Sequence, residues 1–420
     1  MELTTSKYKQ TEVGIIPKDW NILSIGDLLV FKNGLNKESE FFGYGTPIVN
    51  YMDVFKNYGI RRNDIEGKVF LNREEKKNFS ARKGDVFFTR TSETQEEIGT
   101  SAVLLEDIED CVFSGFILRG RPKNDIIASE YYQYCMIPQY VRRQIISTSS
   151  YTTRALTNGR FLSKVKLGIP STLTEQKAIA TALSDVDDLI ANLDKLITKK
   201  KAIKQGAMQQ LLTPPHKGGK RLAGFTGEWV EKKLGDIAQM NSGGTPSSKV
   251  SEYYNGDINW VSITDMTNTG KYILSSGKKI TEQGLQNSSA RLFPKDTVLL
   301  AMYASIGKCT IAKAEVTTSQ AILGITVNNS LDIEYLYYFL IYKKDELISQ
   351  GQQGTQSNLN KGMVQNVIMC LPQIKEQNAI AKILSDMDLE IEQLATKKAK
   401  YQDLKQGMMQ ELLTGKTRLV

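Results

Sequence analysis

Histidine and cysteine, two residue types that commonly carry catalysis, are sparse in this chain. Its one histidine is His216, in the run 214–219, which is rich in proline and glycine. Triads, general bases and metal clusters built on histidine need further partners in a defined geometry, and this run does not supply them. The four cysteines lie far apart and include no C-x-x-C pair, so neither a zinc site nor a disulfide framework is expected. They are Cys111, Cys135, Cys309 and Cys370.

Three short segments resemble fragments of nucleotide or nuclease sites. Gly415–Thr417 reads Gly-Lys-Thr but lacks the upstream glycine of a phosphate-binding loop. Phe42–Gly45 has the glycines of a methyl-donor-binding loop, yet no Asn-Pro-Pro-aromatic tetrad follows it, so we interpret it as a turn. Glu74–Lys76 fits an acid-x-lysine nuclease pattern, which arises by chance in a chain this rich in both residue types. We therefore expect no catalytic, cofactor-binding or metal-ligating residue in this chain.

The sequence contains an internal repeat, so the elements that must position any remaining functional side chains occur in two copies. Residues 174–213 and 375–414 align without a gap at an offset of 201 residues, and about half of the aligned positions are identical. A repeat of this kind fixes the architecture. We predict a globular segment, a helix, a second globular segment and a second helix, with two similar surfaces related by a pseudo-two-fold axis.

Each repeated segment carries one narrow apolar seam. Its apolar residues recur at alternating spacings of three and four, which is the pattern of a coiled coil. Such a seam must be covered by another helix, so we predict that the two copies pair as an antiparallel coiled coil. About forty residues at ~1.5 Å each give a rod of about 60 Å. The predicted pairing residues are Ile179, Leu183, Val186, Ile190, Leu193, Ile197, Ile380, Leu384, Met387, Ile391 and Leu394.

The globular segments match each other more faintly. Short β-rich runs such as 86–88 and 297–300 alternate with helical stretches such as 128–146 and 333–349. The pattern predicts α/β (mixed α+β) globular domains, repeated in tandem and each followed by a long helix. The linker 214–227 marks the boundary between the halves. The predicted divisions are 1–165, 166–214, 215–366 and 367–420.

The overall charge favours an acidic partner. The formal net charge is +8 and the pI is near 9.0, which places nucleic acid first among partner classes. No run approaches the ~18 apolar residues of a membrane span, so no membrane partner is expected. The polar N-terminus does not resemble a signal peptide, and we expect a reduced, cytoplasmic location.

Ordered motifs in the second globular segment carry a resemblance to a known family. They are Ser242–Pro246 (SGGTP), Gly256–Ser262 (GDINWVS), Ala301–Lys308 (AMYASIGK) and Thr318–Ala321 (TSQA). On these motifs and the duplication, the chain resembles the specificity (S) subunit of type I restriction–modification systems. The first segment departs at Lys32–Asn36, where Gly-Gly-Thr-Pro would stand, although its closing half fits. The resemblance covers nearly the whole chain.

The resemblance implies a DNA-binding subunit that is not itself an enzyme. Each target recognition domain would read one half of a split sequence in double-stranded DNA. The helices would set the spacer between the halves and dock two modification (methyltransferase) subunits, and restriction subunits would complete the complex. S-adenosylmethionine, ATP and Mg²⁺ are then expected on partner subunits. Because the two globular segments differ in sequence, we predict a non-palindromic target.

Candidate DNA-reading residues lie in polar loops. Base edges are read by Arg, Asn, Gln, Ser and Thr, whereas Lys and Arg also contact phosphates. The nominated residues are Arg90, Thr91, Ser92, Arg154, Asn158, Arg160, Tyr303, Ser305, Lys308, Gln356 and Asn358. For any one of them the alternative is a solvated surface side chain. We expect Arg142 and Arg143 on a solvated or phosphate-facing helix surface, and we expect that the glycines of Ser242–Pro246 either let the backbone approach a phosphate or form an ordinary turn.

Other repeated or bulky residues have different expected roles. Trp20, Trp229 and Trp260 are flanked by strand-like apolar residues and are assigned to cores. Each helix copy holds a glycine, which costs about 1 kcal/mol inside a helix. Its recurrence at one offset predicts a docking surface for the modification subunits, and the alternative is inherited duplication without function. The nominated docking residues are Lys204, Gly206, Lys405 and Gly407.

Two other classes of function remain as alternatives. A self-contained DNA methyltransferase or nuclease is disfavoured by the missing histidine cluster and the missing tetrad. A scaffold whose coiled coil joins two protein-binding modules is disfavoured by the basic charge and by the family resemblance.

Overall fold

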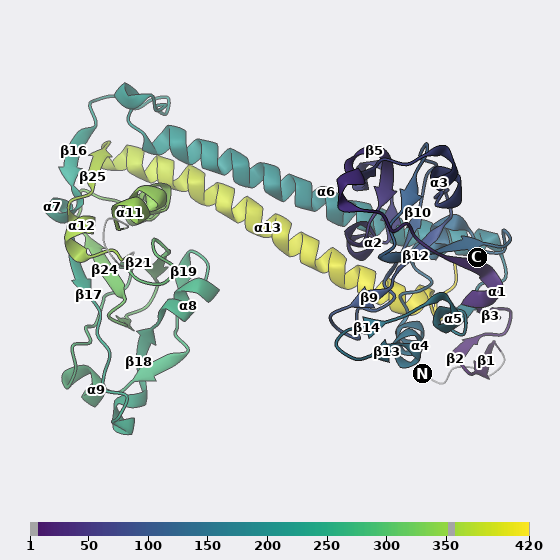
Figure 1. Cartoon of the computed structure of the whole chain (residues 1–420). Helices are drawn as coiled ribbons and strands as arrows, with labels where there is room; N and C mark the ends of the chain where they lie inside the picture. Colours follow the sequence, from purple (N-terminus) through teal and green to yellow (C-terminus); the bar gives the residue numbers. More distant parts are fainter. Residues whose placement is uncertain (1–6, 352–357, 420) are drawn as a thin grey trace. The chain divides into compact units, whose positions relative to one another are not determined.

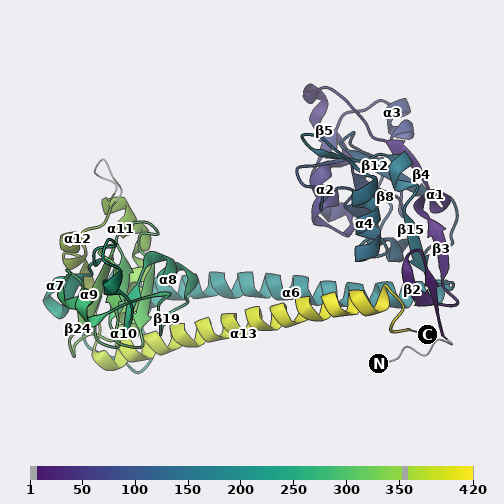
Figure 2. The same ribbon diagram turned by 90° about the horizontal axis from the view of Figure 1, so that it is seen from below.

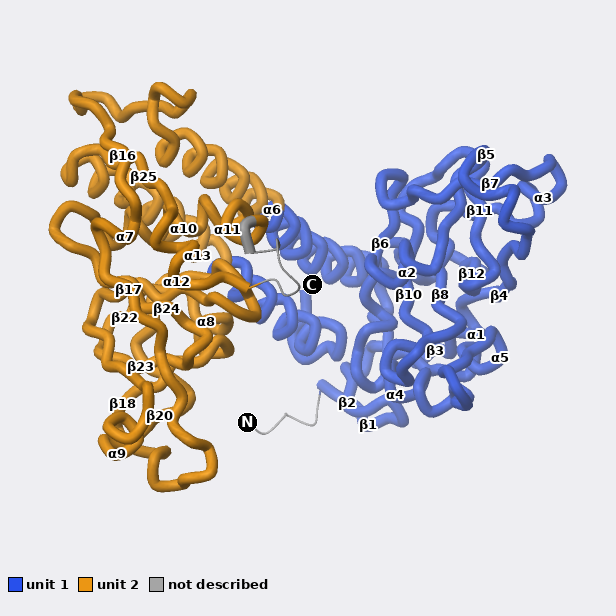
Figure 3. The backbone as a smooth tube through the Cα atoms, turned by 60° about the vertical axis from the view of Figure 1, so that its left-hand side comes forward, with its two compact units in different colours: residues 1–194, 396–420 blue, residues 195–395 orange. Residues whose placement is uncertain are grey.

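The computed structural model describes residues 7–351 and 358–419. They form two compact units, shown in different colours in Figure 3. Unit 1 comprises Met1–Asp194 and Thr396–Val420, and unit 2 comprises Lys195–Ala395. The two long helices are α6 (Leu173–Leu212) and α13 (Ile374–Leu412), so each unit contains the first part of one long helix and the last part of the other. The expected alternation of globular segment and long helix is confirmed (Figure 1).

The core of unit 1 is a five-stranded sheet buried on both faces. Its strands, in spatial order, are β4 (Leu29–Asn33), β12 (Ile117–Pro122), β8 (Val86–Thr89), β10 (Ser101–Leu104) and β6 (Gly59–Ile60). Only β6 runs parallel to its neighbour. Successive side chains of a strand point to opposite faces. Accordingly Val86 and Phe88 join one apolar cluster with the long helices, whereas Phe87 joins another.

Smaller elements of unit 1 surround this sheet. The remaining strands are β1 (Tyr8–Thr11), β2 (Gly14–Pro17), β3 (Asn21–Ser24), β5 (Phe42–Val49), β7 (Lys68–Val69), β9 (Thr91–Ser92), β11 (Val112–Phe113), β13 (Ser150–Tyr151), β14 (Ala155–Leu156) and β15 (Lys166–Ile169). The helices are α1 (Ile25–Leu28), α2 (Tyr51–Lys56), α3 (Arg73–Asn78), the 3-10 helix η3 (Ser129–Gln133), α4 (Gln139–Thr148) and α5 (Gly159–Leu162).

Unit 2 repeats this topology. Its five-stranded sheet is β17 (Ala238–Ser242), β24 (Ile322–Val327), β21 (Val298–Ala301), β22 (Cys309–Ala312) and β19 (Tyr272–Ile273). The other strands are β16 (Val230–Lys233), β18 (Tyr254–Val261), β20 (Lys278–Ile280), β23 (Thr317–Thr318) and β25 (Ile368–Leu371). The helices are α7 (Leu234–Ile237), α8 (Ile263–Asn268), α9 (Glu282–Gln286), α10 (Ile333–Tyr342), α11 (Lys344–Gly351) and α12 (Lys361–Gln365). Again only the last strand of the sheet, β19, runs parallel to its neighbour.

Two of the short segments read from the sequence form defined local structure. The expected turn at Phe42–Gly45 is instead the start of strand β5, whose pairing with β7 is interrupted by a bulge. Gly43 and Gly45 have φ angles of 97° and 95°, a left-handed conformation that glycine adopts without strain. In α3, the Glu75 carboxylate accepts hydrogen bonds from the backbone N–H of Asn72 and from Lys37.

The long helices run antiparallel within each unit, and ion pairs fix their register. In unit 1, Asp187 and Asp194 of α6 bind Lys405 and Lys398 of α13, with N–O distances of 2.5 and 2.6 Å. In unit 2, Lys204 binds Asp388 at 2.5 Å and Lys200 binds Glu390 at 2.6 Å. Within each unit the two helices lie side by side in both views (Figure 1 and Figure 2). The predicted helix pairing is therefore confirmed.

The predicted seam also packs against the globular domains. The first seam residues of each helix, such as Leu183 and Leu384, are fully buried in their domain's core. The end of the opposite helix enters the same core, through Leu412 in unit 1 and Leu212 in unit 2. The later seam residues Val186, Leu193 and Ile197 are buried, and Ile190, Met387, Ile391 and Leu394 are half-buried. The three tryptophans are buried as predicted, at 1%, 8% and 8% exposure for Trp20, Trp229 and Trp260.

The four predicted divisions follow the repeat along the sequence and stay a prediction. The compact units of the structure divide the residues differently, because each core includes the end of the distant helix.

In the described part of the chain, the structure contains no helix with the length and apolar character that crossing a membrane requires.

A buried glutamate at the start of each long helix is bound by an arginine that follows the other helix. Glu175 is 1% exposed, and its carboxylate accepts from Nε and Nη2 of Arg418 at 2.5 and 2.8 Å. In unit 2, Arg221 Nη2 donates to the fully buried Glu376 at 2.7 Å. We call these two contacts the clasps. Arg418 also donates two hydrogen bonds to Asp19, which lower the pKa of that carboxyl group.

The clasp of unit 1 generates a stability prediction. Replacing Arg418 by Ala leaves Glu175 as an uncompensated buried charge, so we expect the free energy of unfolding of unit 1 to fall by about 3 kcal/mol. Urea unfolding of the full chain at neutral pH, followed by circular dichroism, measures this change. The double variant Arg418→Ala/Glu175→Gln removes the charge as well and should recover most of the loss. Wild-type stability in the single variant would contradict the assigned role.

Candidate nucleic-acid interface

The two nominated runs of unit 1 lie side by side in the structure. Strand β14 pairs antiparallel with β9, so Leu156 stands opposite Thr91 and Ala155 opposite Ser92. The backbone N–H of Thr157 donates to the carbonyl of Arg90 at 3.0 Å, which extends the pairing by one residue. Strand β13 joins the other edge of β14. Two polar segments about sixty residues apart in sequence therefore form one three-stranded surface.

The three residues nominated around β9 differ in how much of their side chain is free. Arg90 is half-buried, and its Nη1 donates to the carbonyl oxygen of Gly115 at 2.9 Å. Thr91 is half-buried as well. Ser92 is 4% exposed and its hydroxyl donates to Glu97, so this side chain holds the following loop in place.

The residues nominated around β14 include the most accessible cations of this surface. Arg154 is exposed and forms an ion pair of 2.9 Å with the exposed Glu93. Arg160 is exposed on α5. Asn158 begins that helix, and its Oδ1 accepts from the backbone N–H of Phe161 at 3.0 Å. Asn158 therefore caps α5, and its amide NH₂ remains the part of the side chain suited to a ligand.

The loop between β9 and β10 is held in place by Arg142, which lies on helix α4. Arg142 donates to the carbonyl oxygens of Glu96, Ile98 and Gly99 at 2.9, 2.6 and 3.0 Å. Burial lowers the pKa of its guanidinium. Its expected position on a solvated or phosphate-facing surface is wrong, because all of these carbonyls belong to a loop more than forty residues away. Arg143 is exposed, as expected.

Exposed apolar side chains on the same surface escaped the sequence reasoning. Phe116 is 69% exposed, Tyr151 is 52% exposed and Leu156 is 41% exposed. Phe116 precedes β12, and its carbonyl accepts from the N–H of Arg90. Aromatic rings stack on unpaired bases, and apolar groups contact the thymine methyl in the major groove. An aromatic residue inside the otherwise polar run 147–160 was the available signal for Tyr151.

The charge of this surface is mixed. Glu93, Glu96 and Glu97 are exposed in the loop after β9, where Glu93 forms the ion pair with Arg154 and Glu97 accepts from Ser92. Carboxylates repel phosphates but accept hydrogen bonds from the amino group of cytosine. The loop is therefore chemically suited to base edges, while Arg154 and Arg160 can also contact phosphates.

In unit 2, the corresponding surface lies between β21 and β22. Tyr303 and Ser305 are exposed there, and Ser305 has a left-handed φ of 57°. Lys308 is half-buried and donates to the carbonyl of Thr269, so it holds the loop rather than projecting from it. The N–H of Leu359 donates to Met302 O at 3.0 Å, which repeats the contact between Thr157 and Arg90.

The nominated loop of unit 2 is only partly described. Gln356 lies outside the described residues, and Asn358 is half-buried. The counterpart of Asn158 is Asn360, which was not nominated and which caps α12 by accepting from the N–H of Met363 at 3.0 Å. The shared Asn followed by a short helix was the sequence signal.

The glycines of Ser242–Pro246 do not line a ligand-facing loop. Both are buried, and an added Cβ would lie 2.1 Å from Thr318 Oγ1 at Gly243 and 2.2 Å from Ser289 C at Gly244. The indole N–H of Trp260 donates to the Gly244 carbonyl at 2.9 Å. These glycines allow close internal packing, and neither the expected phosphate contact nor an ordinary surface turn describes them.

The docking residues nominated on the long helices divide into two groups. Lys204 and Lys405 are used inside the chain, in the ion pairs with Asp388 and Asp187. Gly206 and Gly407 are exposed, and a Cβ added at either would meet no described atom within 4 Å. One turn before each glycine, Ile203 and Leu404 are 47% and 50% exposed. The two apolar positions are equivalent in the repeat.

Comparison with known proteins finds a family that matches both halves of the chain. The family described as "Type I restriction modification DNA specificity domain" matches residues 17–205 and 226–401. A similar protein is the putative type I restriction enzyme MjaX specificity subunit of Methanocaldococcus jannaschii. It is 26% identical over 428 residues, which cover 98% of this chain and 97% of that protein.

Solved structures share the fold. The type I restriction–modification S subunit from M. genitalium has a TM-score of 0.58 and 16% identity, covering 94% of this chain and 96% of that one. A chain from a structure concerned with complex assembly and conformational transition of the type I R-M system has a TM-score of 0.60 and 16% identity. It covers 96% of this chain and 99% of that one. The expected fold and the family resemblance are thereby confirmed.

Two substitutions at this interface distinguish a side chain that contacts DNA from one that holds a loop in place. Replacing Arg154 by Ala removes an exposed cation, so we expect affinity for the target duplex to fall by about 1–3 kcal/mol with an unchanged melting temperature. Replacing Arg142 by Ala removes three hydrogen bonds to the loop, so we expect a lower melting temperature as well as weaker binding. Thermal unfolding and duplex titration measure both. Arg143→Ala, on the same helix, is the control for stability; equal melting temperatures for Arg142→Ala and Arg143→Ala would contradict the positioning role.

Proposed function

The chain belongs to the type I restriction modification DNA specificity family, and from this premise we propose that it is the sequence-specific DNA-binding subunit of a type I restriction–modification complex. The observation that carries the proposal is the duplication of one fold with different side chains at equivalent surface positions. The strand pairing aligns the half-buried Arg90 of unit 1 with Met302 of unit 2, which is only 3% exposed, so the difference at the surface begins at the next residue. By the same alignment, Thr91 corresponds to Tyr303.

Each unit would read one half of a bipartite target. Equivalent scaffolds place equivalent segments against DNA, whereas the side chains that meet the base edges differ between the units. A non-palindromic target follows from these differences. The half-site spacing is a geometric property of the protein that holds the two readers, and the long helices supply it.

The helices would also dock two modification subunits. Ile203 with Gly206 and Leu404 with Gly407 form two equivalent exposed patches, one on each helix. Two equivalent patches suit two copies of one partner. A glycine without Cβ lets a partner backbone approach closely.

The chemistry of the complex would reside on partner chains. In this proposal the modification subunits bind S-adenosylmethionine and methylate adenine, and the restriction subunits bind ATP and Mg²⁺. The chain itself contributes recognition and assembly, without a catalytic residue. The complex works where chromosomal DNA is, which places it in the cytoplasm.

The proposed function is tested by mapping methylated adenines across the host genome with and without this gene. We expect deletion to abolish methylation at one split motif, and the motif itself gives both half-sites and the spacer. Restoring the gene with Arg154→Ala should relax the base requirement in one half of the methylated motif and leave the other half unchanged. An unchanged methylome on deletion of the gene would favour the scaffold function.

Docking is tested separately by charge insertion on the helices. Replacing Ile203 or Leu404 by Glu places a charge in an apolar patch, so we expect each single variant to lose one modification subunit and the double variant to lose both. Size-exclusion chromatography with mass determination of the reconstituted complex counts the subunits. Leu274→Glu, at a 69% exposed residue that is not part of either long helix, is the matched control. Two bound subunits in both single variants would contradict docking at these patches.

A further inference from the structure

The duplication allows equivalent positions of the two units to be compared. In unit 1 the N–H of Val103 donates to the carbonyl of Tyr58 at 3.0 Å. In unit 2 the N–H of Ile311 donates to the carbonyl of Lys271 at 2.8 Å, at the same step of the equivalent parallel strand pair. Tyr58 and Lys271 therefore occupy one position of the fold.

In unit 2, the lysine at this position is held in a site built for an ammonium group. Lys271 Nζ donates to Glu334 Oε2 at 2.7 Å, to Ser385 Oγ at 2.9 Å and to Tyr338 Oη at 3.2 Å. It also lies 4.7 Å from the centre of the Tyr338 ring. The Lys271 side chain is only 11% exposed. Three acceptors and an aromatic face match the three N–H donors and the charge of a primary ammonium.

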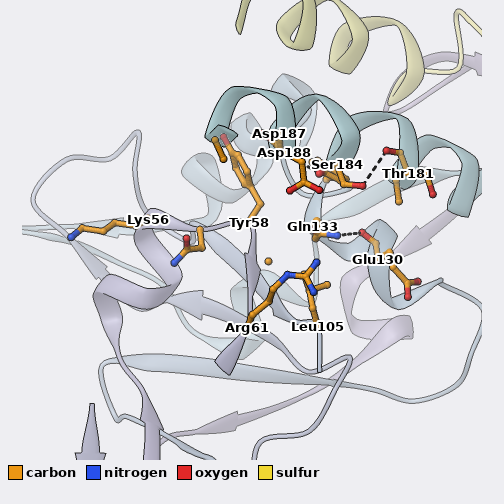
Figure 4. A pocket seen from close by; sticks show the side chains of 15 residues that line it. Lys56, Tyr58, Arg61, Leu105, Glu130, Gln133, Thr181, Ser184, Asp187 and Asp188 are labelled. Atoms are coloured by element: carbon orange, nitrogen blue, oxygen red, sulfur yellow. Dashed lines mark hydrogen bonds between the residues drawn. The ribbon is translucent and has the colours of Figure 1, made fainter. Parts of the chain in front are cut away.

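Unit 1 keeps the acceptors of this site without the lysine. Glu130, Tyr134 and Ser184 correspond to Glu334, Tyr338 and Ser385, and the two tyrosines donate equivalent hydrogen bonds to Asp187 and Asp388. All of the unit 1 residues line an open pocket of about 530 Å³. Figure 4 shows Glu130, Ser184, Asp187 and Asp188 around it.

Among the described residues, the unit 1 site has no cation in the place that Lys271 takes in unit 2, although Lys405 lies nearby, 4.4 Å from the centre of the Tyr58 ring. Asp187 binds Lys405, as Asp388 binds Lys204 in unit 2. The Glu130 carboxylate has no hydrogen-bond or ion-pair partner among the described residues, whereas Glu334 is paired with Lys271. Asp188 adds a further carboxylate where unit 2 has Leu389.

Two cationic side chains, Lys56 and Arg61, also line the pocket and could neutralise its acids. Lys56 points away from the aspartates in Figure 4, and Arg61 lies on the wall opposite them. Within the described part of the chain, neither side chain forms an ion pair with a carboxylate. Neither therefore takes the role that Lys271 has in unit 2.

We propose that the pocket between β6, η3 and α6 in unit 1 binds a primary ammonium group from outside the chain. The group is held by Glu130, Ser184 and Tyr134, as Lys271 is held in unit 2, and Asp188 attracts further positive charge. Its source is a free polyamine or a lysine side chain of a partner protein. The acceptors would bind the ammonium group of either source. The Tyr134 ring is already flanked by the Tyr58 ring, with centres 6.3 Å apart, and by Lys405 Nζ at 6.0 Å, so the acceptors rather than an aromatic face carry the site.

The test is calorimetric titration of the DNA-free full chain with two probes, spermidine and Nα-acetyl-lysine methylamide. We expect saturable binding of one equivalent, weakened about tenfold in Glu130→Gln because a charge-assisted hydrogen bond is lost. Spermidine binding at least about tenfold tighter than the lysine derivative indicates a polyamine site, since the additional ammonium groups reach Asp188. Equal affinities, with spermidine displaced by added modification subunits, indicate a partner's lysine.

Three variants keep the proposal falsifiable. Glu334→Gln, in the site that Lys271 already fills, should leave probe binding unchanged, and an equal loss in this variant would overturn the proposal. Tyr58→Lys supplies an internal ammonium, so it should abolish binding while the chain stays folded by circular dichroism. Arg61→Ala should tighten binding severalfold, by removing a like charge. Binding seen only in Arg61→Ala would show that Arg61 itself occupies the site, which would overturn the proposal. Absence of binding in the wild type and in all variants would also refute the proposal.

Discussion

Each half of this protein depends on neutralising a carboxylate that the fold buries at the start of a long helix. Glu175 and Glu376 are buried where their helices enter the domain cores. An ionised carboxylate in such a place is tolerated only with a cation and hydrogen bonds. The cation comes in each case from the segment that follows the opposite helix, Arg418 or Arg221. The same contact therefore satisfies a buried charge and holds the two helices antiparallel, which in turn fixes where each recognition surface stands on its own unit.

Around this shared frame, the two units have diverged at their recognition surfaces and at the site that Lys271 fills in unit 2. The paired sheets, the bulged strands and the bonds from tyrosine to aspartate recur in both. Side chains at the loop ends differ, as they must if each unit is to discriminate a different sequence on one scaffold. The position of Tyr58 and Lys271 differs in another way. Unit 2 supplies a positive charge there through its own lysine, whereas unit 1 has a tyrosine at that position.

Local and periodic properties could be predicted from the sequence, and contacts between distant segments could not. The repeat, the apolar seam and the buried tryptophans follow from spacing and composition alone, and the structure confirms them. The polar runs of unit 1 were nominated separately, and nothing in either run indicates that β9 and β14 pair. Arg142 was misplaced for a physical reason: a long cationic side chain on a helix looks solvated until its partners, more than forty residues away in the sequence, are known.

Unit 1 is assembled from both ends of the sequence, whereas unit 2 is a single continuous stretch. A ribosome delivers a chain from its N-terminus at roughly 5–20 residues per second, and domains generally fold as they emerge. All of unit 2 has been synthesised before residue 396 is added, but at that point the core of unit 1 still lacks Leu412 and its clasp lacks Arg418. The first half synthesised is thus the last to be completed. Until residues 396–418 are made, its apolar helix-binding surface stays open to chaperones and to other nascent chains.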